Sequence, residues 1–115
     1  MDAENPVFVD LGRDARLMDP VKNGQCVLDD TSGKILIIGG WTERETTDAV
    51  HVYDPSTHNC GLSGITLPKC IEGHSIVKVD DSIFIFGGFD SLGVTDSIMK
   101  IDLNTRAATL LPIKL

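Results

Sequence analysis

The sequence is poor in aromatic residues, which make up 5% of its 115 residues, with one tryptophan and one tyrosine. It has no apolar run near the roughly 18 residues that a membrane-spanning helix needs. Its first residues lack a basic region followed by an apolar one, so we expect no signal peptide. No window shows a capped helical stripe of apolar positions. These absences argue against a membrane protein, a secreted protein and a helical fold.

Basic residues are also scarce, with 10 Lys and Arg against 17 Asp and Glu and a net charge of −7. Nucleic-acid binding needs clustered Lys and Arg that release counterions, so the net charge disfavours this class of function. The three cysteines, Cys26, Cys60 and Cys70, are an odd number. Without a secretion signal we expect them to be reduced thiols, which indicates a cytoplasmic protein or a nuclear one.

What the sequence does contain is a repeat, with residues 35–60 resembling residues 83–108. Each unit begins with four apolar residues and two glycines, continues with an aromatic residue and a polar loop, and ends with a second apolar segment and a threonine. Corresponding residues lie 48 positions apart: Gly39 and Gly87, Tyr53 and Ile101, Asp54 and Asp102, and Thr57 and Thr105. A period of this length predicts stacked supersecondary units.

Each unit is predicted to form four short antiparallel strands. Short β-branched and aromatic runs bounded by Asp, Ser and Gly indicate two hairpins, at residues 27–39 and 73–87. Residues 49–54 alternate as a third strand, and weaker fourth strands are expected at residues 58–62 and 107–111. The continuous apolar runs of the hairpins suggest strands covered on both faces.

An apolar strand ending in Gly-Gly and an aromatic residue, followed by a strand ending in Tyr-Asp-Pro, resembles the kelch repeat. The matching residues are Ile37-Ile38-Gly39-Gly40-Trp41 with Val52-Tyr53-Asp54-Pro55, and Ile85-Phe86-Gly87-Gly88-Phe89 with Ile101-Asp102. The resemblance implies an all-β fold of four-stranded antiparallel kelch blades that form part of a β-propeller. The chain departs from the family where Cys60 and Ala108 replace a tryptophan.

This resemblance divides the chain into a half blade at residues 1–23, one repeat at 24–72 and a second at 73–115. One extra residue in the first hairpin turn aligns Gly24 with Gly73. Propellers close with roughly four to eight blades, so two and a half blades leave sheet edges open. We therefore expect either a piece of a longer protein or self-association through the open edges.

Catalytic and metal-binding patterns are missing from the sequence. Ser75 and His74 are neighbours in a predicted strand and point to opposite faces, which disfavours a nucleophilic pair. The glycine pairs lack the Lys and Ser/Thr of a phosphate-binding loop. The residues His58, Cys60, Cys70 and His74 lack zinc-site spacing. We expect no enzyme, no cofactor and no bound metal.

The loops after the glycine pairs are the predicted binding site, because binding residues gather on loops held by a rigid scaffold. Trp41, Arg44 and Phe89 are of types enriched at interface hot spots. The resemblance implies that the aromatic residues and those just before each first strand line one face: Trp41, Phe89, Lys22, Asn23, Ile71 and Glu72. The alternative for Trp41 and Phe89 is packing between blades. Where the family usually carries arginine before the first strand, this chain has Lys22 in one unit and Ile71 in the other, which argues against an acidic peptide as partner.

The predicted function is protein–protein interaction, with another protein as partner and no nucleic acid or membrane. The resemblance implies substrate recognition for a cullin-type ubiquitin ligase adaptor, or a cytoskeletal scaffold. Two alternatives are part of a propeller enzyme of the galactose-oxidase type and a non-functional truncated fragment.

Overall fold

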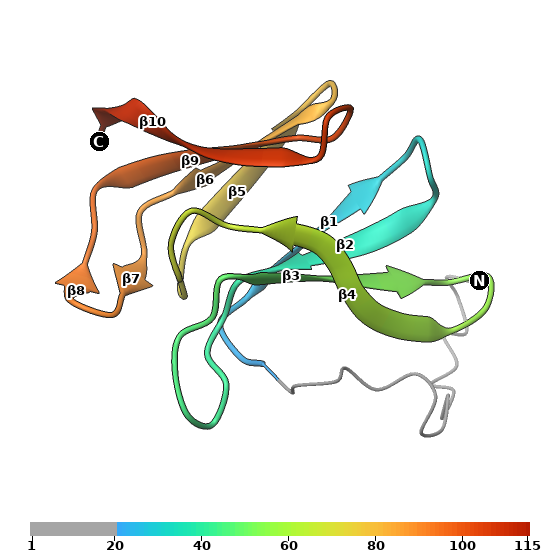
Figure 1. Cartoon of the computed structure of the whole chain (residues 1–115), viewed down its shortest axis with the longest axis horizontal. Helices are drawn as coiled ribbons and strands as arrows, with labels where there is room; N and C mark the ends of the chain where they lie inside the picture. The colour runs from blue at the N-terminus through green and yellow to red at the C-terminus, as the bar shows by residue number, and fades with distance from the viewer. Residues whose placement is uncertain (1–20) are drawn as a thin grey trace, which may run out of the picture.

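The computed structural model describes residues 21–115, which form two four-stranded antiparallel sheets and a small hairpin (Figure 1). The first sheet, blade 1, contains in spatial order β1 (Gln25–Asp29), β2 (Lys34–Ile38), β3 (Ala49–Asp54) and β4 (Asn59–Thr66). The second, blade 2, contains β5 (Ser75–Val79), β6 (Ser82–Phe86), β9 (Ser97–Asp102) and β10 (Ala107–Lys114). β7 (Phe89–Asp90) and β8 (Gly93–Val94) pair with each other.

This arrangement confirms the predicted all-β class and the four antiparallel strands of each unit. Both sheets lie within the expected repeats, 24–72 and 73–115. Nearly all of the half blade expected at residues 1–23 lies outside the described residues. No helix that could cross a membrane occurs between residues 21 and 115.

The fourth strands are longer than predicted and continue past residues 62 and 111. After a register shift, Thr66 pairs with Ala49 and Lys114 pairs with Ser97. Gly61, Gly64 and Pro112 lower the strand propensity of these segments, because glycine and proline are depleted in strands. Pairing with the first residues of β3 and β9 keeps them extended nonetheless.

The expected alignment of Gly24 with Gly73 is wrong by one residue. Gln25 pairs with Ile38, whereas Ser75 pairs with Phe86, the residue that corresponds to Ile38 in the 48-residue repeat. Gln25 therefore corresponds to Ser75, and Gly24 to His74. The shift arises because the first hairpin turn is longer by two residues, not one. It makes Lys22 the counterpart of Glu72, and Val21 the counterpart of Ile71.

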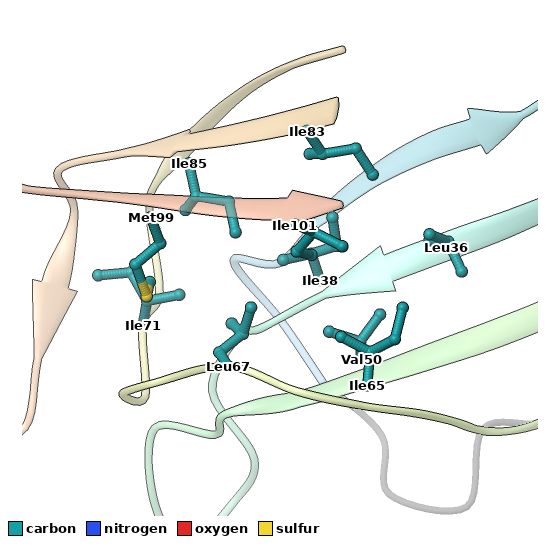
Figure 2. Packing of buried hydrophobic residues seen from close by; sticks show 10 residues of the cluster. All are labelled: Leu36, Ile38, Val50, Ile65, Leu67, Ile71, Ile83, Ile85, Met99 and Ile101. Carbon is teal, nitrogen blue, oxygen red and sulfur yellow. The ribbon is translucent and has the colours of Figure 1, made fainter. Parts of the chain in front are cut away.

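The hydrophobic core lies between the two sheets. Figure 2 shows its side chains pointing toward one another from both blades, joined by Ile71 from the segment that connects them. In β2 only Leu36 and Ile38 are buried, while Ile35 and Ile37 are partly exposed. The expectation that both faces of these strands are covered is therefore not met. Ten buried residues form the core: Leu36, Ile38, Val50, Ile65, Leu67, Ile71, Ile83, Ile85, Met99 and Ile101.

Residues 71–74, the second docking segment, attach blade 2 to the glycine pair of blade 1. The Gly40 N–H donates to the Ile71 carbonyl at 2.8 Å, and the Ile71 N–H donates to the Thr47 carbonyl at 3.2 Å. Nε2 of the buried His74 lies 2.9 Å from the Ile38 carbonyl oxygen. A Cβ atom on Gly39, whose φ is +63°, would lie 2.7 Å from the Ile71 carbonyl oxygen. Only glycine satisfies both this backbone angle and this close approach.

Comparing Gly39→Ala with a control variant should separate two losses in the free energy of unfolding, one from crowding by neighbouring atoms and one from the left-handed backbone angle. The matched control is Gly33→Ala, because Gly33 has a φ of +74° and nothing within 4 Å of its Cβ position. The left-handed angle alone costs about 1–2 kcal/mol in either variant. We expect Gly39→Ala to lower the free energy of unfolding by roughly 2 kcal/mol more than the control, measured by urea denaturation. Equal losses would contradict the tight docking.

Burial of His74 makes stability depend on pH. Desolvation lowers the pKa of His74, outweighing the opposing hydrogen bond to Ile38. The unfolded chain, with an ordinary histidine pKa of about 6.5, then binds more protons than the folded chain just below that pH. We expect stability to be full above pH 6.5 and to fall as the pH is lowered through 6.5 toward the folded pKa. His74→Gln should have a flatter profile in urea unfolding between pH 7.5 and 5; an unchanged slope would assign the effect elsewhere.

Candidate functional site

The predicted binding residues gather at one end of the two sheets, which we term the loop face. It consists of the first docking segment (residues 21–24), the loop at 41–48, the second docking segment (71–74) and the loop at 89–96 that contains β7 and β8. In Figure 1 these loops hang from the same end of both sheets, away from the hairpin turns at the opposite end. Hydrogen bonds join each docking segment to the loop of its own blade.

In blade 1, Trp41 is fixed to Lys22 through the backbone. The Lys22 N–H donates to the Trp41 carbonyl at 2.9 Å, and the Trp41 N–H donates to the Lys22 carbonyl at 2.7 Å. The Lys22 Nζ atom lies 4.7 Å from the centroid of the Trp41 ring, a cation–π distance. Val21, Lys22, Trp41 and Glu43 line a mainly apolar pocket of about 190 Å³. Trp41 stays partly exposed beside this pocket.

Blade 2 repeats the backbone geometry with different side chains. Glu72 and Phe89 exchange backbone hydrogen bonds of 2.9 and 2.8 Å. Phe89 is 49% exposed, and its ring lies over Gly73. The Glu72 carboxylate accepts hydrogen bonds from Asn23 Nδ2 at 3.3 Å and from Thr46 Oγ1 at 3.4 Å. Glu72 therefore links the loop faces of the two blades.

The structure thus brings together Lys22, Asn23, Trp41, Glu72 and Phe89 as the sequence predicts. Neither aromatic residue belongs to the core between the blades, so packing between these two blades does not account for them.

Arg44 and Ile71 are placed differently from the other predicted residues. Arg44 is exposed at the tip of the 41–48 loop, where the Thr42 N–H donates to the Glu45 carbonyl. Ile71 has no exposed surface and belongs to the core. Its expected place on the binding face is therefore wrong, because its side chain is buried in the core between the two sheets.

Lys69 also holds the site in place, although no sequence pattern predicts this role. Its ammonium donates to Asp90 Oδ2 at 2.8 Å, Thr95 Oγ1 at 3.0 Å and Ser97 Oγ at 2.8 Å. The hydrogen bond from Lys69 is the main cause that lowers the pKa of the Asp90 carboxyl. These partners lie 21 to 28 residues from Lys69, and the three bonds hold the loop that carries Phe89.

The residues considered for nucleophilic and zinc chemistry lie apart. Nε2 of His74 faces the Ile38 carbonyl, whereas its neighbour Ser75 is exposed. His58 lies in a turn at the opposite end of the sheets and pairs with the Tyr53 hydroxyl at 2.8 Å. Within residues 21–115, no three His, Cys, Asp or Glu side chains are grouped so that they could hold a metal ion.

Comparison with known proteins agrees with this geometry. The sequence model of a family described as the Kelch motif matches residues 31–60, which contain the first glycine pair and Tyr-Asp-Pro. The chain is 28% identical over 93 residues to Kelch domain-containing protein 3 of Bos taurus. The kelch motif that the sequence indicates is confirmed at residues 31–60. The chain is also 33% identical over 58 residues to Spermatocyte protein spe-26 of Caenorhabditis elegans.

The matched segments cover 76% and 50% of this chain, but 24% and 10% of these two relatives. The solved structure of YjhT superposes with a TM-score of 0.67 at 14% identity, over 80% of this chain and 37% of that one. This likeness shows the fold: antiparallel kelch blades of a partial β-propeller. Repeats and fold together support a protein-interaction module of the propeller type.

Replacing Lys69 by methionine should loosen the loop that presents Phe89. The variant keeps the side-chain length but loses three hydrogen bonds, so amides at residues 90–95 should exchange with solvent roughly three- to tenfold faster. Amides of β6, and those of β9 after Ser97, should be unaffected in the same hydrogen-exchange experiment. Lys34→Met, at the opposite end of the sheets, is the control. Unchanged exchange in the Lys69 variant would show that the loop is held without it.

Proposed function

We propose that this kelch chain binds another protein through its loop face. The observation that carries the proposal is that five exposed or partly exposed residues from two successive repeats meet there: Lys22, Asn23, Trp41, Glu72 and Phe89. Each aromatic residue is fixed by two backbone hydrogen bonds, so little conformational freedom is lost when a partner contacts it. Large aromatic anchors on a rigid scaffold are typical of interface hot spots.

Electrostatics favours a partner segment that is not acidic. The positions beside the two aromatic residues carry opposite charges, Lys22 in blade 1 and Glu72 in blade 2. The Lys22 ammonium lies over the Trp41 ring, and Glu43 and Glu45 are exposed on the adjoining loop. Carboxylates of a partner would face repulsion from Glu72 and from this loop, since like charges that approach closely raise the free energy of binding.

Binding rather than catalysis is the function that the described residues support. The histidine of the docking segment, His74, is buried against a carbonyl group and has no nucleophile beside it. Asn23 donates to the Glu72 carboxylate and Lys69 donates to the Asp90 carboxylate, so these polar side chains hold loops in place. These side chains therefore stabilise the binding surface, and none of them is a general base next to a nucleophile.

The wider role that we propose is substrate recognition within a cullin-type ubiquitin ligase adaptor, with a cytoskeletal scaffold as the competing assignment. The location that we propose is the cytoplasm or the nucleus, which suits the free thiols of Cys26 and Cys70. Affinity capture from cell extract separates the two roles. Ubiquitin ligase subunits or ubiquitylated clients would support the adaptor, and filament proteins the scaffold. A fluorescent fusion tests the location.

Removing the aromatic anchors should abolish partner binding without unfolding the chain. We expect Trp41→Ala combined with Phe89→Ala to weaken binding by about 2 kcal/mol or more, roughly thirtyfold, in titrations with the captured partner. Both side chains lie outside the core, so the urea unfolding midpoint should change little. Thr31→Ala, an exposed change at the opposite end, is the control. Unaltered affinity in the double variant would refute the loop face as the binding site.

A further inference from the structure

An asparagine–glycine pair, Asn23-Gly24, lies in the first docking segment, and the Asn23 side chain is exposed. The side-chain amide of an asparagine can react with the backbone nitrogen of the next residue. The reaction is easiest when that residue is glycine, because no Cβ atom hinders the approach of the two groups. The other two asparagines among residues 21–115, Asn59 and Asn104, precede a cysteine and a threonine. Asn23 is therefore the asparagine of this part of the chain that is best placed to lose its amide group.

Few interactions restrain the two groups that would react. Among residues 21–115, no group accepts a hydrogen bond from the Gly24 N–H. Within the same residues, the Asn23 side chain makes one hydrogen bond, from Nδ2 to Glu72 Oε2 at 3.3 Å, which is long for an N–H···O bond and exposed to solvent. The Asn23 carbonyl accepts from the Gly73 N–H at 2.9 Å. Opening these two bonds frees the side chain to turn onto the Gly24 nitrogen, and exposed bonds at a loop open readily.

We propose that Asn23 is a deamidation site, and that its conversion to a carboxylate switches off the contact between the two docking segments. The Gly24 nitrogen attacks Cγ of Asn23 and forms a C–N bond. The bond from Cγ to Nδ2 breaks, and Nδ2 leaves as ammonia with the proton of the Gly24 N–H. One water molecule then opens the five-membered imide at either of its two carbonyl carbons. The products are aspartate and isoaspartate, and nothing is oxidised or reduced.

Either product changes the interaction with Glu72 from attraction to repulsion. The amide of Asn23 donates to the Glu72 carboxylate, whereas an ionised carboxylate in its place accepts only. Two negative charges then lie at hydrogen-bond distance, which is unfavourable even at an exposed site. Isoaspartate also lengthens the main chain by one CH₂ group between Lys22, which is bonded to Trp41, and β1. The first docking segment then no longer fits against the second.

The second blade shows that this position does not require an asparagine. The counterpart of Asn23 is Gly73, and their φ angles are +59° and +63°. Glycine adopts this left-handed angle without strain, and asparagine is among the residues that tolerate it. A glycine at position 23 would therefore keep the backbone angle but would have no amide to lose. Asn23→Gly is accordingly the matched variant that cannot deamidate.

The rate of deamidation tests the first part of the proposal, and the contact between the docking segments tests the second. The folded chain is incubated at neutral and at mildly alkaline pH and then digested for mass spectrometry. We expect Asn23 to become aspartate and isoaspartate roughly tenfold or more faster than Asn59 and Asn104, which serve as internal controls. The reaction should accelerate at the higher pH, because loss of the Gly24 N–H proton makes the nitrogen a better nucleophile.

Hydrogen exchange of the Gly73 amide, which donates to the Asn23 carbonyl, reports on the docking contact. In the ¹⁵N-labelled chain this amide should exchange roughly three- to tenfold faster after deamidation, and Asn23→Asp should shift it in the same direction. The Gly87 amide, bonded to the Ser97 carbonyl in blade 2, should not change. Asn23→Gly should show the same Gly73 exchange before and after the incubation. These measurements do not depend on whether the loop face binds a partner.

The proposal is overturned if Asn23 loses its amide no faster than Asn59 and Asn104. It is equally overturned if the deamidated chain and Asn23→Asp both keep the Gly73 exchange rate of the unmodified chain.

Discussion

The contact between the second docking segment and the glycine pair of blade 1 determines how the two blades pack and which residues form the loop face. Because Gly39 has no side chain, the Ile71 carbonyl approaches closely enough for the Gly40 N–H to donate to it. This approach inserts Ile71 into the core and buries His74. It also allows the Gly73 N–H to donate to the Asn23 carbonyl, which aligns the two docking segments side by side. The loop face exists because the blades are docked in this way.

The sequence predicts the parts of this arrangement that depend on short-range patterns. Gly-Gly after an apolar run predicts a close backbone approach, and the aromatic residue that follows must then emerge at the same end of each blade. The sequence does not predict which residue of β1 corresponds to which residue of β5. A hairpin turn can gain two residues without changing the strands that it joins. Lys69 could not have been found either, since its partners are far along the chain and meet it only after folding.

The two repeats share a backbone but not a surface. Two backbone hydrogen bonds join Lys22 to Trp41 in blade 1, and the same two bonds join Glu72 to Phe89 at the equivalent positions of blade 2. Because these bonds do not depend on side-chain identity, the residues on the loop face can vary while its geometry stays constant. The opposite charges of Lys22 and Glu72 mean that a partner spanning both blades meets two different environments. The loop-face side chains then determine which partner binds, and the backbone determines where those side chains lie.

The close approach of the backbone at the glycine pair also means that different residues determine partner recognition and stability. The Trp41 side chain does not belong to the core, whereas the Trp41 backbone pairs with Lys22 and continues directly from Gly40. Shortening the Trp41 side chain leaves both backbone bonds in place. A Cβ atom on Gly40, by contrast, would lie 2.9 Å from the Lys22 carbonyl oxygen, which is too close. The adjacent residues Gly40 and Trp41 thus have different functions. The Trp41 side chain is partly exposed and can be replaced, whereas Gly40 must remain glycine because neighbouring backbone atoms approach it closely. A partner can therefore select among loop-face side chains without disturbing the docking that holds the blades together.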